Sequence, residues 1–263
     1  RHPDVARVGH SPSLATRRLD SGRSPSSSIP DAAPQTHLGA RYPGRLTNPF
    51  SKAKAPKSVT DSGDMQDPRL RRLTRQIARN PANVNNPEPR EGYAQAAVAL
   101  VLRAADEVEL LLIKRAKSVC DPWSGHVALP GGHRAPSDPT LLETAIRETS
   151  EETGIELGAS GSYLGRLTEA SPSNQQLPRI TVIPYVFTVP PYVDPRVNSV
   201  EVESVIWVST ETLLNPNSSR TTTIQLPEGP VRFPSYRVGE HQIWGLTFRI
   251  LTELLTTGLA DKA

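Results

Sequence analysis

Four glutamates fall within ten residues of one short segment, and three of them share its expected helical face. On a helix that turns about 100° per residue, Glu148, Glu151 and Glu152 lie on one narrow strip. The opposite side, which is expected to face the core, carries Leu142, Ile146, Thr149 and Thr153. Clustered carboxylate oxygens are ligands that hard divalent ions such as Mg²⁺ prefer. The segment 142–153 therefore predicts an amphipathic helix with a metal-binding face.

A solvated run of charge is the simpler interpretation of this helix, because Arg147 can pair with Glu151 four residues further along. Two neighbouring features favour a site instead. Gly131 and Gly132 lead into the helix, and glycine permits a close backbone approach that a side chain would block, so a glycine carbonyl can face the same metal. Arg147 stands directly before Glu148, where its guanidinium can orient a neighbouring carboxylate through forked hydrogen bonds.

The same segment resembles a known motif. From Gly132 to Ile155 the pattern G-x14-R-E-T-S-E-E-T-G-I is similar to the Nudix box, G-x5-E-x7-R-E-U-x-E-E-x-G-U, in which U is aliphatic. The residues that match the second half of the box are Arg147, Glu148, Glu151, Glu152, Gly154 and Ile155. The loop is one residue longer than in the box, Asp138 stands where the first glutamate would be, and Thr149 replaces an aliphatic residue.

The longer loop is similar to that of the coenzyme A pyrophosphatase branch of the Nudix family. Residues 111–132 and 243–255 resemble the strand and loop before the box and the C-terminal helix of the same branch, so the resemblance covers roughly residues 94–255. Asp121 stands where the branch has a basic residue, and Leu129 stands where it has phenylalanine. Coenzyme A is therefore one candidate among nucleotide-type substrates.

The resemblance implies a divalent-metal-dependent hydrolysis of a pyrophosphate bond in a nucleoside diphosphate linked to another moiety. It implies that Mg²⁺ or Mn²⁺ is held by Glu148, Glu151, Glu152 and the carbonyl of Gly132. Arg147 would be the orienting residue, and it belongs with Glu151 and Glu152 to the expected catalytic residues. Metal ions suit this chemistry because they bridge phosphates and lower the pKa of bound water.

The general base is expected either within the box or in a later loop. In "NSVEVESVIWVS", Glu201 occupies a position similar to that of a downstream glutamate in the family, and Glu203, two residues on, is the alternative. A solvated loop carboxylate is the other interpretation of Glu201. Asp138 and Glu143 are expected to cap and solvate the start of the helix rather than to bind metal.

Three residues ahead of the box are expected to contact the substrate: Arg115, Trp123 and His126. Packing and turn formation are the alternative roles for Trp123 and His126. The later tryptophans, Trp207 and Trp244, are expected to lie in the core.

Two other functions compete with hydrolysis. A catalytically inactive Nudix-like module would keep the fold to bind a nucleotide, but the intact carboxylates of the box argue against it. An RNA-interacting protein would use the basic segment 1–64, yet the rest of the chain carries 20 basic and 22 acidic groups, which gives no reason to expect nucleic-acid binding. The expected partner is a small nucleotide-type substrate, with a homodimer as the commonest soluble assembly.

The first 64 residues carry ten Lys and Arg, five Asp and no Glu, with recurring Pro and Ser and no hydrophobic period. Such a segment buries too little apolar surface to offset its ordering entropy, so disorder is expected. It is interpreted either as an organellar transit peptide or as sequence upstream of a start at Met65, the only methionine.

The rest of the composition predicts a protein without a membrane segment, because no stretch approaches the roughly 18 consecutive apolar residues that a membrane helix needs. Cys120 is the only cysteine, which excludes an intramolecular disulfide and a metal site built from several cysteines. The expected location is the cytoplasm, or an organelle if the leader is a transit peptide.

Residues 65–90 are expected to form a short helix and a linker, with Leu70, Leu73 and Ile77 at helical spacing. Residues 91–258 are expected to form the Nudix domain. Helices interspersed with strands imply one α/β domain, and the resemblance implies an α/β/α sandwich around a central mixed sheet.

Within this domain, a β-hairpin is predicted from two apolar runs, 94–102 and 108–113. Further strands are expected in 162–169, 179–189, 202–209 and 233–238. Residues 171–178 and 215–230 are expected to be loops. A closing helix in 242–255 is predicted from the spacing of Ile243, Leu246, Ile250 and Leu254.

Overall fold

The computed structural model describes residues 67–83, 87, 89–118, 124–172, 178–226 and 229–260 of the 263-residue chain. The predicted leader at 1–64 lies outside the described residues, as do Cys120, Asp121 and Trp123. Within the described part, no helix is long and apolar enough to cross a membrane.

A seven-stranded mixed sheet forms the centre of the domain. Its main path is β3-β2-β1-β6-β5, with β4 paired to β1 and β7 paired to β2. β1 and β6 run parallel, and the other named pairs are antiparallel. The strands are β1 (Ala94–Ala104), β2 (Val108–Arg115), β3 (Val127–Ala128), β4 (Gly131–His133), β5 (Ser162–Arg166), β6 (Ile180–Thr188) and β7 (Val202–Ser209).

The predicted hairpin is confirmed, because β1 and β2 pair antiparallel with Leu102 opposite Leu110. Successive side chains of a strand point to opposite faces of its sheet. Along β1, Ala97, Ala99 and Val101 accordingly belong to one buried cluster, and Leu100 and Leu102 belong to another. A strand buried on both faces reads as a continuous apolar run, which is the pattern of 96–102.

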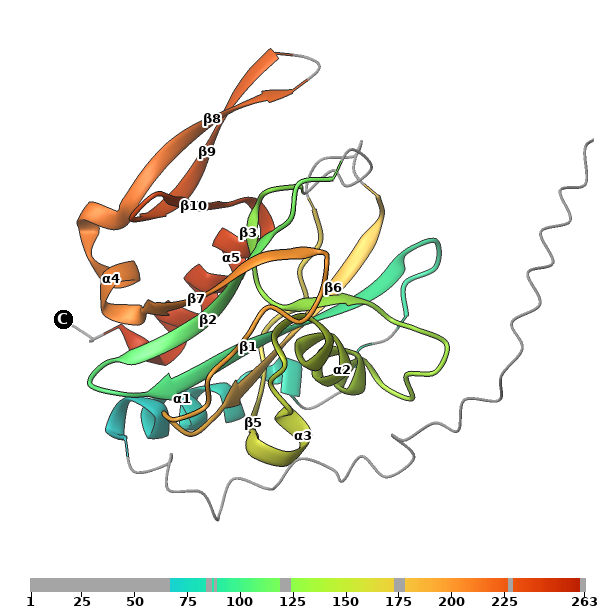
Figure 1. Cartoon of the computed structure of the whole chain (residues 1–263), viewed down its shortest axis with the longest axis vertical. Helices are drawn as coiled ribbons and strands as arrows, with labels where there is room; N and C mark the ends of the chain where they lie inside the picture. Colours follow the sequence, from blue (N-terminus) through green and yellow to red (C-terminus); the bar gives the residue numbers. More distant parts are fainter. Residues whose placement is uncertain are drawn as a thin grey trace, which may run out of the picture. The chain divides into compact units, whose positions relative to one another are not determined.

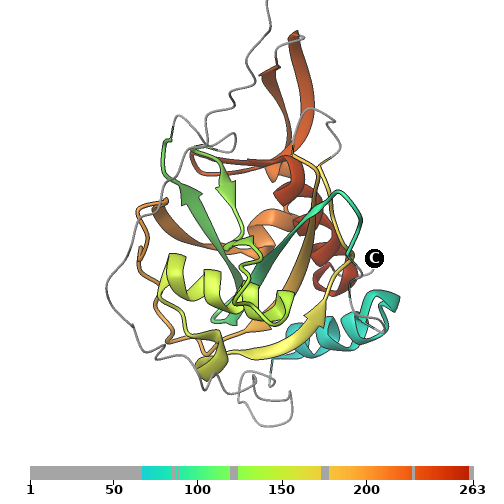
Figure 2. The ribbon, with the colours of Figure 1, turned by 90° about the vertical axis from the view of Figure 1, so that its right-hand side faces the viewer.

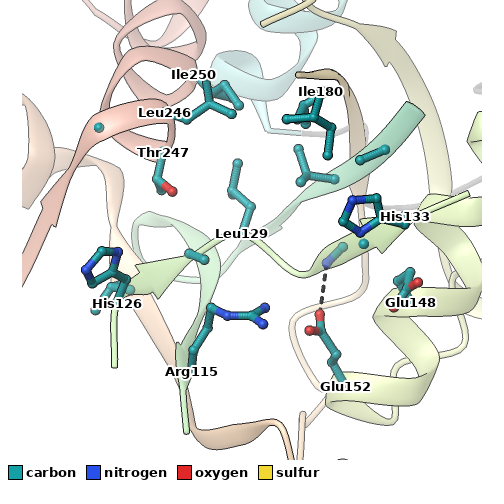
Figure 3. A pocket seen from close by; sticks show the side chains of 18 of the residues that line it. Arg115, His126, Leu129, His133, Glu148, Glu152, Ile180, Leu246, Thr247 and Ile250 are labelled. Atoms are coloured by element: carbon teal, nitrogen blue, oxygen red, sulfur yellow. Dashed lines mark hydrogen bonds between the residues drawn. The ribbon is translucent and has the colours of Figure 1, made fainter. Parts of the chain in front are cut away.

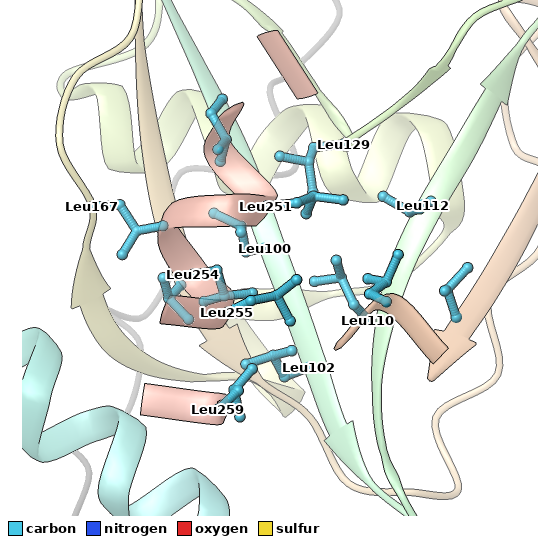
Figure 4. Packing of buried hydrophobic residues seen from close by; sticks show 14 of the residues in the cluster. Leu100, Leu102, Leu110, Leu112, Leu129, Leu167, Leu251, Leu254, Leu255 and Leu259 are labelled. Carbon is cyan, nitrogen blue, oxygen red and sulfur yellow. The ribbon is translucent and has the colours of Figure 1, made fainter. Parts of the chain in front are cut away.

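Helices cover both faces of this sheet (Figure 1 and Figure 2). α2 (Leu141–Thr153) and α3 (Leu157–Ser160) pack on the face of Ala97 and Val101. The other face is covered by α1 (Pro68–Ala78), α5 (Gly245–Leu254) and the π-helical turn η4 (Leu255–Leu259). Figure 4 shows leucines of β1 and β2 meeting leucines of α5 and η4. The predicted α/β/α sandwich is confirmed.

The predicted helix near residue 70 is confirmed as α1, and it belongs to this core. The Asp67 side chain caps it by accepting the backbone N–H groups of Arg69 and Leu70. Leu70, Leu73 and Ile77 are fully buried in the same cluster as the leucines of β1. The short η2 (Pro81–Asn83) follows.

Two close contacts join α1 to the rest of the domain. A Cβ on Gly165 would lie 2.4 Å from Cγ2 of Ile77, so only glycine lets β5 approach the helix at this point. The Arg72 guanidinium donates to the carbonyls of Gly258 and Leu259 at 2.7 and 3.1 Å, which satisfies backbone groups at the end of η4.

A second, three-stranded sheet lies where a loop was expected. After α4 (Thr210–Leu214) and η3 (Pro216–Ser218), β8 (Ser219–Leu226) pairs with β9 (Gly229–Val238), which pairs with β10 (His241–Trp244). In Figure 1 the β8–β9 arm extends from the rest of the domain. The loop prediction for 215–230 is therefore wrong. Its threonine run favours a strand, but the run lacks the apolar residues at alternate positions by which a half-buried strand is predicted.

The closing helix starts later than predicted. Ile243 is a buried strand residue of β10, and α5 begins at Gly245, whose φ of 66° lies in the left-handed region. The rest of the predicted stripe is confirmed for Ile250 and Leu254, which are buried, and Leu246 is half-buried.

The burial of α1 predicts a large loss of stability when one of its buried leucines is truncated to alanine. Leu73→Ala should lower the free energy of unfolding by about 2–5 kcal/mol, because a fully buried leucine leaves a cavity. Arg75→Ala, at an exposed position of the same helix, is the matched control and should change it by less than about 0.5 kcal/mol. Equal, small effects in urea unfolding would show that α1 does not belong to the cooperative core.

Candidate active site

A cavity of about 550 Å³ opens beside α2. At one end lie Glu148 and Glu152 of α2, and on the opposite side lie His126 and the start of α5 (Figure 3); Glu151 also lines the cavity. Arg115 of β2 and Leu129 lie between these two ends. The cavity wall also contains aliphatic side chains, namely Ala96, Val98, Ile180, Val182, Leu246 and Ile250.

α2 begins and ends with strong local signals. The Thr140 hydroxyl accepts the backbone N–H of Glu143 at 3.2 Å and donates to the Glu143 carboxylate at 3.0 Å. Gly154 ends the helix in the left-handed conformation with φ of 68°. The expectation that Glu143 takes part in capping is therefore confirmed.

Asp138 is not the solvated cap that the sequence suggested. Its side chain is buried, and it accepts two hydrogen bonds from Arg147, at 2.9 Å from Nε and 2.8 Å from the terminal nitrogen. Further bonds come from the Ala135 N–H and the Thr144 hydroxyl, each at 2.9 Å. Burial alone would raise the pKa of Asp138, but these hydrogen bonds hold that pKa below its usual value. A charged Asp138 thus anchors Arg147.

Arg147 then reaches two of the box carboxylates. Its guanidinium lies 2.9 Å from Glu148 and 3.0 Å from Glu151. The predicted fork of hydrogen bonds goes to Asp138, whereas Glu148 and Glu151 each contact a single guanidinium nitrogen, and the orienting role of Arg147 stays a prediction.

Glu148 lies directly against the backbone of Gly132. A Cβ on Gly132 would lie 2.5–2.8 Å from the carboxyl atoms of Glu148, so any side chain there would displace the carboxylate. Gly132 is fixed opposite Ala97 in the antiparallel pair of β4 and β1. Glycine at position 132 therefore lets the Glu148 carboxylate approach the backbone of β4. Burial of that carboxylate raises the pKa of Glu148.

Glu152 is the most buried of the three carboxylates, with 5% of its surface exposed. It accepts the N–H of Gly131 at 2.8 Å, which Figure 3 marks with a dashed line. Burial raises the pKa of Glu152 to about 8, and the nearby charge of Glu148 adds to this effect. The site therefore holds a carboxylate whose negative charge is poorly compensated.

The predicted core stripe of α2 is only partly right. Thr149 and Thr153 are fully buried, but Leu142 and Ile146 are half-buried. Leu141 and Ala145 are buried on the acidic side of the helix instead. The side of the helix that carries the glutamates therefore packs on the sheet through Leu141 and Ala145 at its start and lines the cavity through Glu148 and Glu152 at its end.

Arg115, the predicted substrate contact, and Glu201, the candidate general base, both line the cavity. Their nearest charged atoms are 3.9 Å apart, and the Glu201 side chain is 69% exposed. Glu203 points elsewhere, because it accepts a hydrogen bond from Lys114 at 2.7 Å outside the cavity lining. The two glutamates are therefore not interchangeable in position.

The cavity lining contains His126, as predicted, and also Trp244 and His133, which were not predicted there. Trp244 was expected in the core. His133 also faces the cavity, and its carbonyl accepts a hydrogen bond from Arg147 at 3.2 Å. The position of His133 directly after the two glycines was the available signal. Trp207 packs against the core, with Arg103 4.1 Å above its ring.

The donor set fits a hard divalent cation. Two carboxylates with raised pKa values, Glu148 and Glu152, lie beside a glycine backbone, and a cation would supply the charge that they lack. In the part of the chain that the structure describes, no three acidic, histidine or cysteine side chains already converge as a finished metal site. Glu148 and Glu151 are turned toward Arg147 instead.

Fold and cavity together define a class of protein: an α/β/α sandwich in which a glutamate-rich helix and a two-glycine strand border one pocket. The profile of the NUDIX domain matches residues 92–225. A Nudix hydrolase of Photorhabdus laumondii, NudL, is 31% identical over 159 residues, which cover 60% of this chain and 82% of that protein.

Two eukaryotic relatives extend this similarity. The mitochondrial coenzyme A diphosphatase NUDT8 of Mus musculus is 32% identical over 171 residues, covering 64% of this chain and 79% of that protein. The protein C14C4.10c of Schizosaccharomyces pombe is 38% identical over 120 residues, but the match spans only 36% of its length. The chain belongs to the Nudix family, and the predicted enzyme class, a Nudix pyrophosphohydrolase, is confirmed.

The burial of Glu152 predicts a pH-dependent stability of the metal-free protein. Because folding raises its pKa from 4.5 to about 8, the folded state binds a proton that the unfolded state releases, and stability falls as pH rises through this window. Glu152→Gln removes the titrating group, so in EDTA its melting temperature should exceed that of the wild type by a few degrees at pH 8. Near pH 4.5 the two temperatures should converge, and a constant difference across the window would contradict this account.

Proposed function

We propose that this chain catalyses the Mg²⁺- or Mn²⁺-dependent hydrolysis of a pyrophosphate bond in a nucleoside diphosphate linked to another moiety. The observation that carries the proposal is the burial of Glu152 beside Glu148 at the wall of a cavity large enough for a nucleotide-type ligand. Burial raises the pKa of both carboxylates, and Glu152 accepts a backbone N–H instead of pairing with Arg147, as a residue that binds a cation could.

The metal would be held by Glu148, Glu151, Glu152 and the carbonyl of Gly132. When bound, it supplies stabilisation of charge on the phosphoryl oxygens and a water of lowered pKa. Arg147, anchored by Asp138, orients two of these carboxylates, and it is not itself a metal ligand. The Gly131 N–H donates to the third, Glu152, and would hold it in position.

The remaining polar groups of the cavity would act on the substrate. Arg115 lies between the acidic end and His126, where its guanidinium can bind a phosphate by forked hydrogen bonds. Glu201, beside Arg115, would accept the proton of the attacking water. His126 would contact the substrate from the far end of the cavity. The predicted contact through Trp123 lies outside the described residues.

Coenzyme A or a related nucleotide is the candidate substrate. The name of NUDT8 supports this assignment, and so does the longer loop of the box. Leu129, which departs from the branch, lines the cavity, so the departure falls where substrate would bind. An organelle is the proposed alternative to the cytoplasm as the location, because NUDT8 is named as mitochondrial. A homodimer stays a prediction.

Turnover measured over a panel of substrates tests the proposal. Coenzyme A, dinucleotides, nucleotide sugars and nucleoside triphosphates should be incubated with Mg²⁺ or Mn²⁺, and one class should be hydrolysed. Glu152→Gln should abolish this turnover, because an amide binds a hard cation weakly, while its cooperative unfolding persists. Glu143→Gln, at the capped start of the same helix and outside the cavity lining, is the matched control and should keep the wild-type rate. A folded wild type that is silent on the whole panel would favour the inactive binding module.

The different positions of Glu201 and Glu203 predict different kinetics. Glu201→Gln should lower kcat by about 10²–10⁴-fold if Glu201 is the general base, and it should remove one limb of the pH–rate profile. Glu203→Gln should leave both unchanged, because Glu203 lies outside the cavity lining and pairs with Lys114. Steady-state rates across pH for the two variants provide the measurement. Similar rates for both would return the role of base to the box.

A further inference from the structure

The end of the cavity opposite the acidic helix is built from aromatic rings. Trp244 lies at the end of β10, and the centroid of its ring is 4.8 Å from that of His126, with the two planes at 65°. Phe233 of β9 lies 5.4 Å from the same indole, tilted by 43°. Two neighbouring rings thus hold the indole in place, so it loses little additional freedom when a ligand lies against it.

Open space adjoins the residue that follows this indole. Gly245 follows Trp244 and has a φ of 66°, a conformation that glycine adopts without strain. A Cβ at Gly245 would meet no described atom within 4 Å, and both residues line the cavity. A half-buried indole beside empty cavity wall is a surface that a planar group can cover.

The cavity therefore offers three different surfaces to a ligand. Its charged groups gather at α2 and Arg115, and its aliphatic wall includes Ile180 and Leu246. The third surface is the aromatic end at His126 and Trp244. A phosphate would bind at Arg115 and at a cation held by the carboxylates of α2, whereas a nucleobase gains most from a flat π-surface, because stacking on an aromatic ring is favourable for every base.

We propose that Trp244 is the platform on which the nucleobase of the substrate stacks, and that Phe233 is a positioning residue for its indole. The inference rests on the proposed function, because it places the phosphates at α2 and Arg115. Since Arg115 lies between Glu152 and His126, a nucleotide whose phosphates lie at Arg115 directs its base toward the aromatic end (Figure 3). The β8–β9 arm, which carries Phe233, thereby takes part in choosing the substrate.

Binding of ADP in the presence of Mg²⁺, measured by calorimetry, tests the platform. Trp244→Leu should weaken ADP binding by roughly tenfold or more, and Trp244→Phe should keep most of the affinity, because it keeps an aromatic ring. Inorganic pyrophosphate, which has no base, should bind wild type and variants equally. Tyr192→Leu, which removes an aromatic ring from an 83% exposed position, is the control and should leave ADP binding unchanged.

Phe233→Leu should weaken ADP binding less than Trp244→Leu does, and it should leave the affinity for pyrophosphate unchanged. Equal ADP affinity in Trp244→Leu and wild type would overturn the platform, as would an equal loss for pyrophosphate or an absence of ADP binding by the wild type. If Trp244→Leu does not fold, 2-azido-ADP can label the wild type. Label on the peptide with His126 or Trp244 supports the platform, and label on β6 overturns it.

These measurements separate the platform from the proposed function, because ADP binding needs no turnover. If the folded protein hydrolyses nothing in the panel but ADP binding depends on Trp244, the hydrolytic function fails and the platform stands. If hydrolysis is normal but neither ADP affinity nor KM responds to Trp244→Leu, only the platform fails. With an active nucleotide substrate, the expected change is an increase in KM with kcat nearly unchanged.

Discussion

The site depends on how closely α2 approaches the backbone of β4. Glu148 lies where a Cβ of residue 132 would be, and Glu152 accepts the N–H of Gly131. β4 is in turn held by its pairing with β1, the central strand. The carboxylates are therefore placed against the middle of the sheet, which gives them a rigid support. The same closeness keeps water away and leaves Glu152 with a raised pKa.

A buried cluster of like charges needs a fixed opposite charge. Arg147 provides it, and the buried Asp138 holds this arginine from the side of the loop. Removing one partner of such a network leaves another charge uncompensated, so the network acts as a unit. One guanidinium shared among three carboxylates cannot satisfy them all, and Glu152 is left to the backbone. That deficit is the chemical reason why a cation suits this place.

Much of this arrangement was readable from the sequence. α1, α2 and the first hairpin carry strong periodic signals, and the spacing of Arg147, Glu148, Glu151 and Glu152 identified the acidic end of the cavity. Arg115, His126 and Glu201 also line the cavity. Their chemical roles, with that of the Gly132 carbonyl, remain predictions.

The rest depended on contacts between distant segments. Trp244 lines the cavity because β10 brings it against His126, and no local pattern distinguishes such a tryptophan from a core residue. Asp138 is buried because Arg147, nine residues later, folds back onto it. From the local sequence it could be interpreted only as an acidic residue before a helix. The strand β8 gave no apolar signal because polar residues occupy most of its positions, although it pairs with β9 along its whole length and buries Thr222.

The attachment of α1 to η4 sets the order in which this domain is completed during synthesis. Arg72 hydrogen-bonds to the carbonyl of Gly258, a residue 186 positions later in the chain, and a Cβ on Gly258 would lie 2.8 Å from the Cα of Leu73. A ribosome makes roughly 5–20 residues per second, so the leucines of α1 stay exposed to solvent for many seconds before the η4 segment is synthesised. The nascent chain thus exposes an amphipathic helix that chaperones can bind, and its final closure follows translation of the η4 segment.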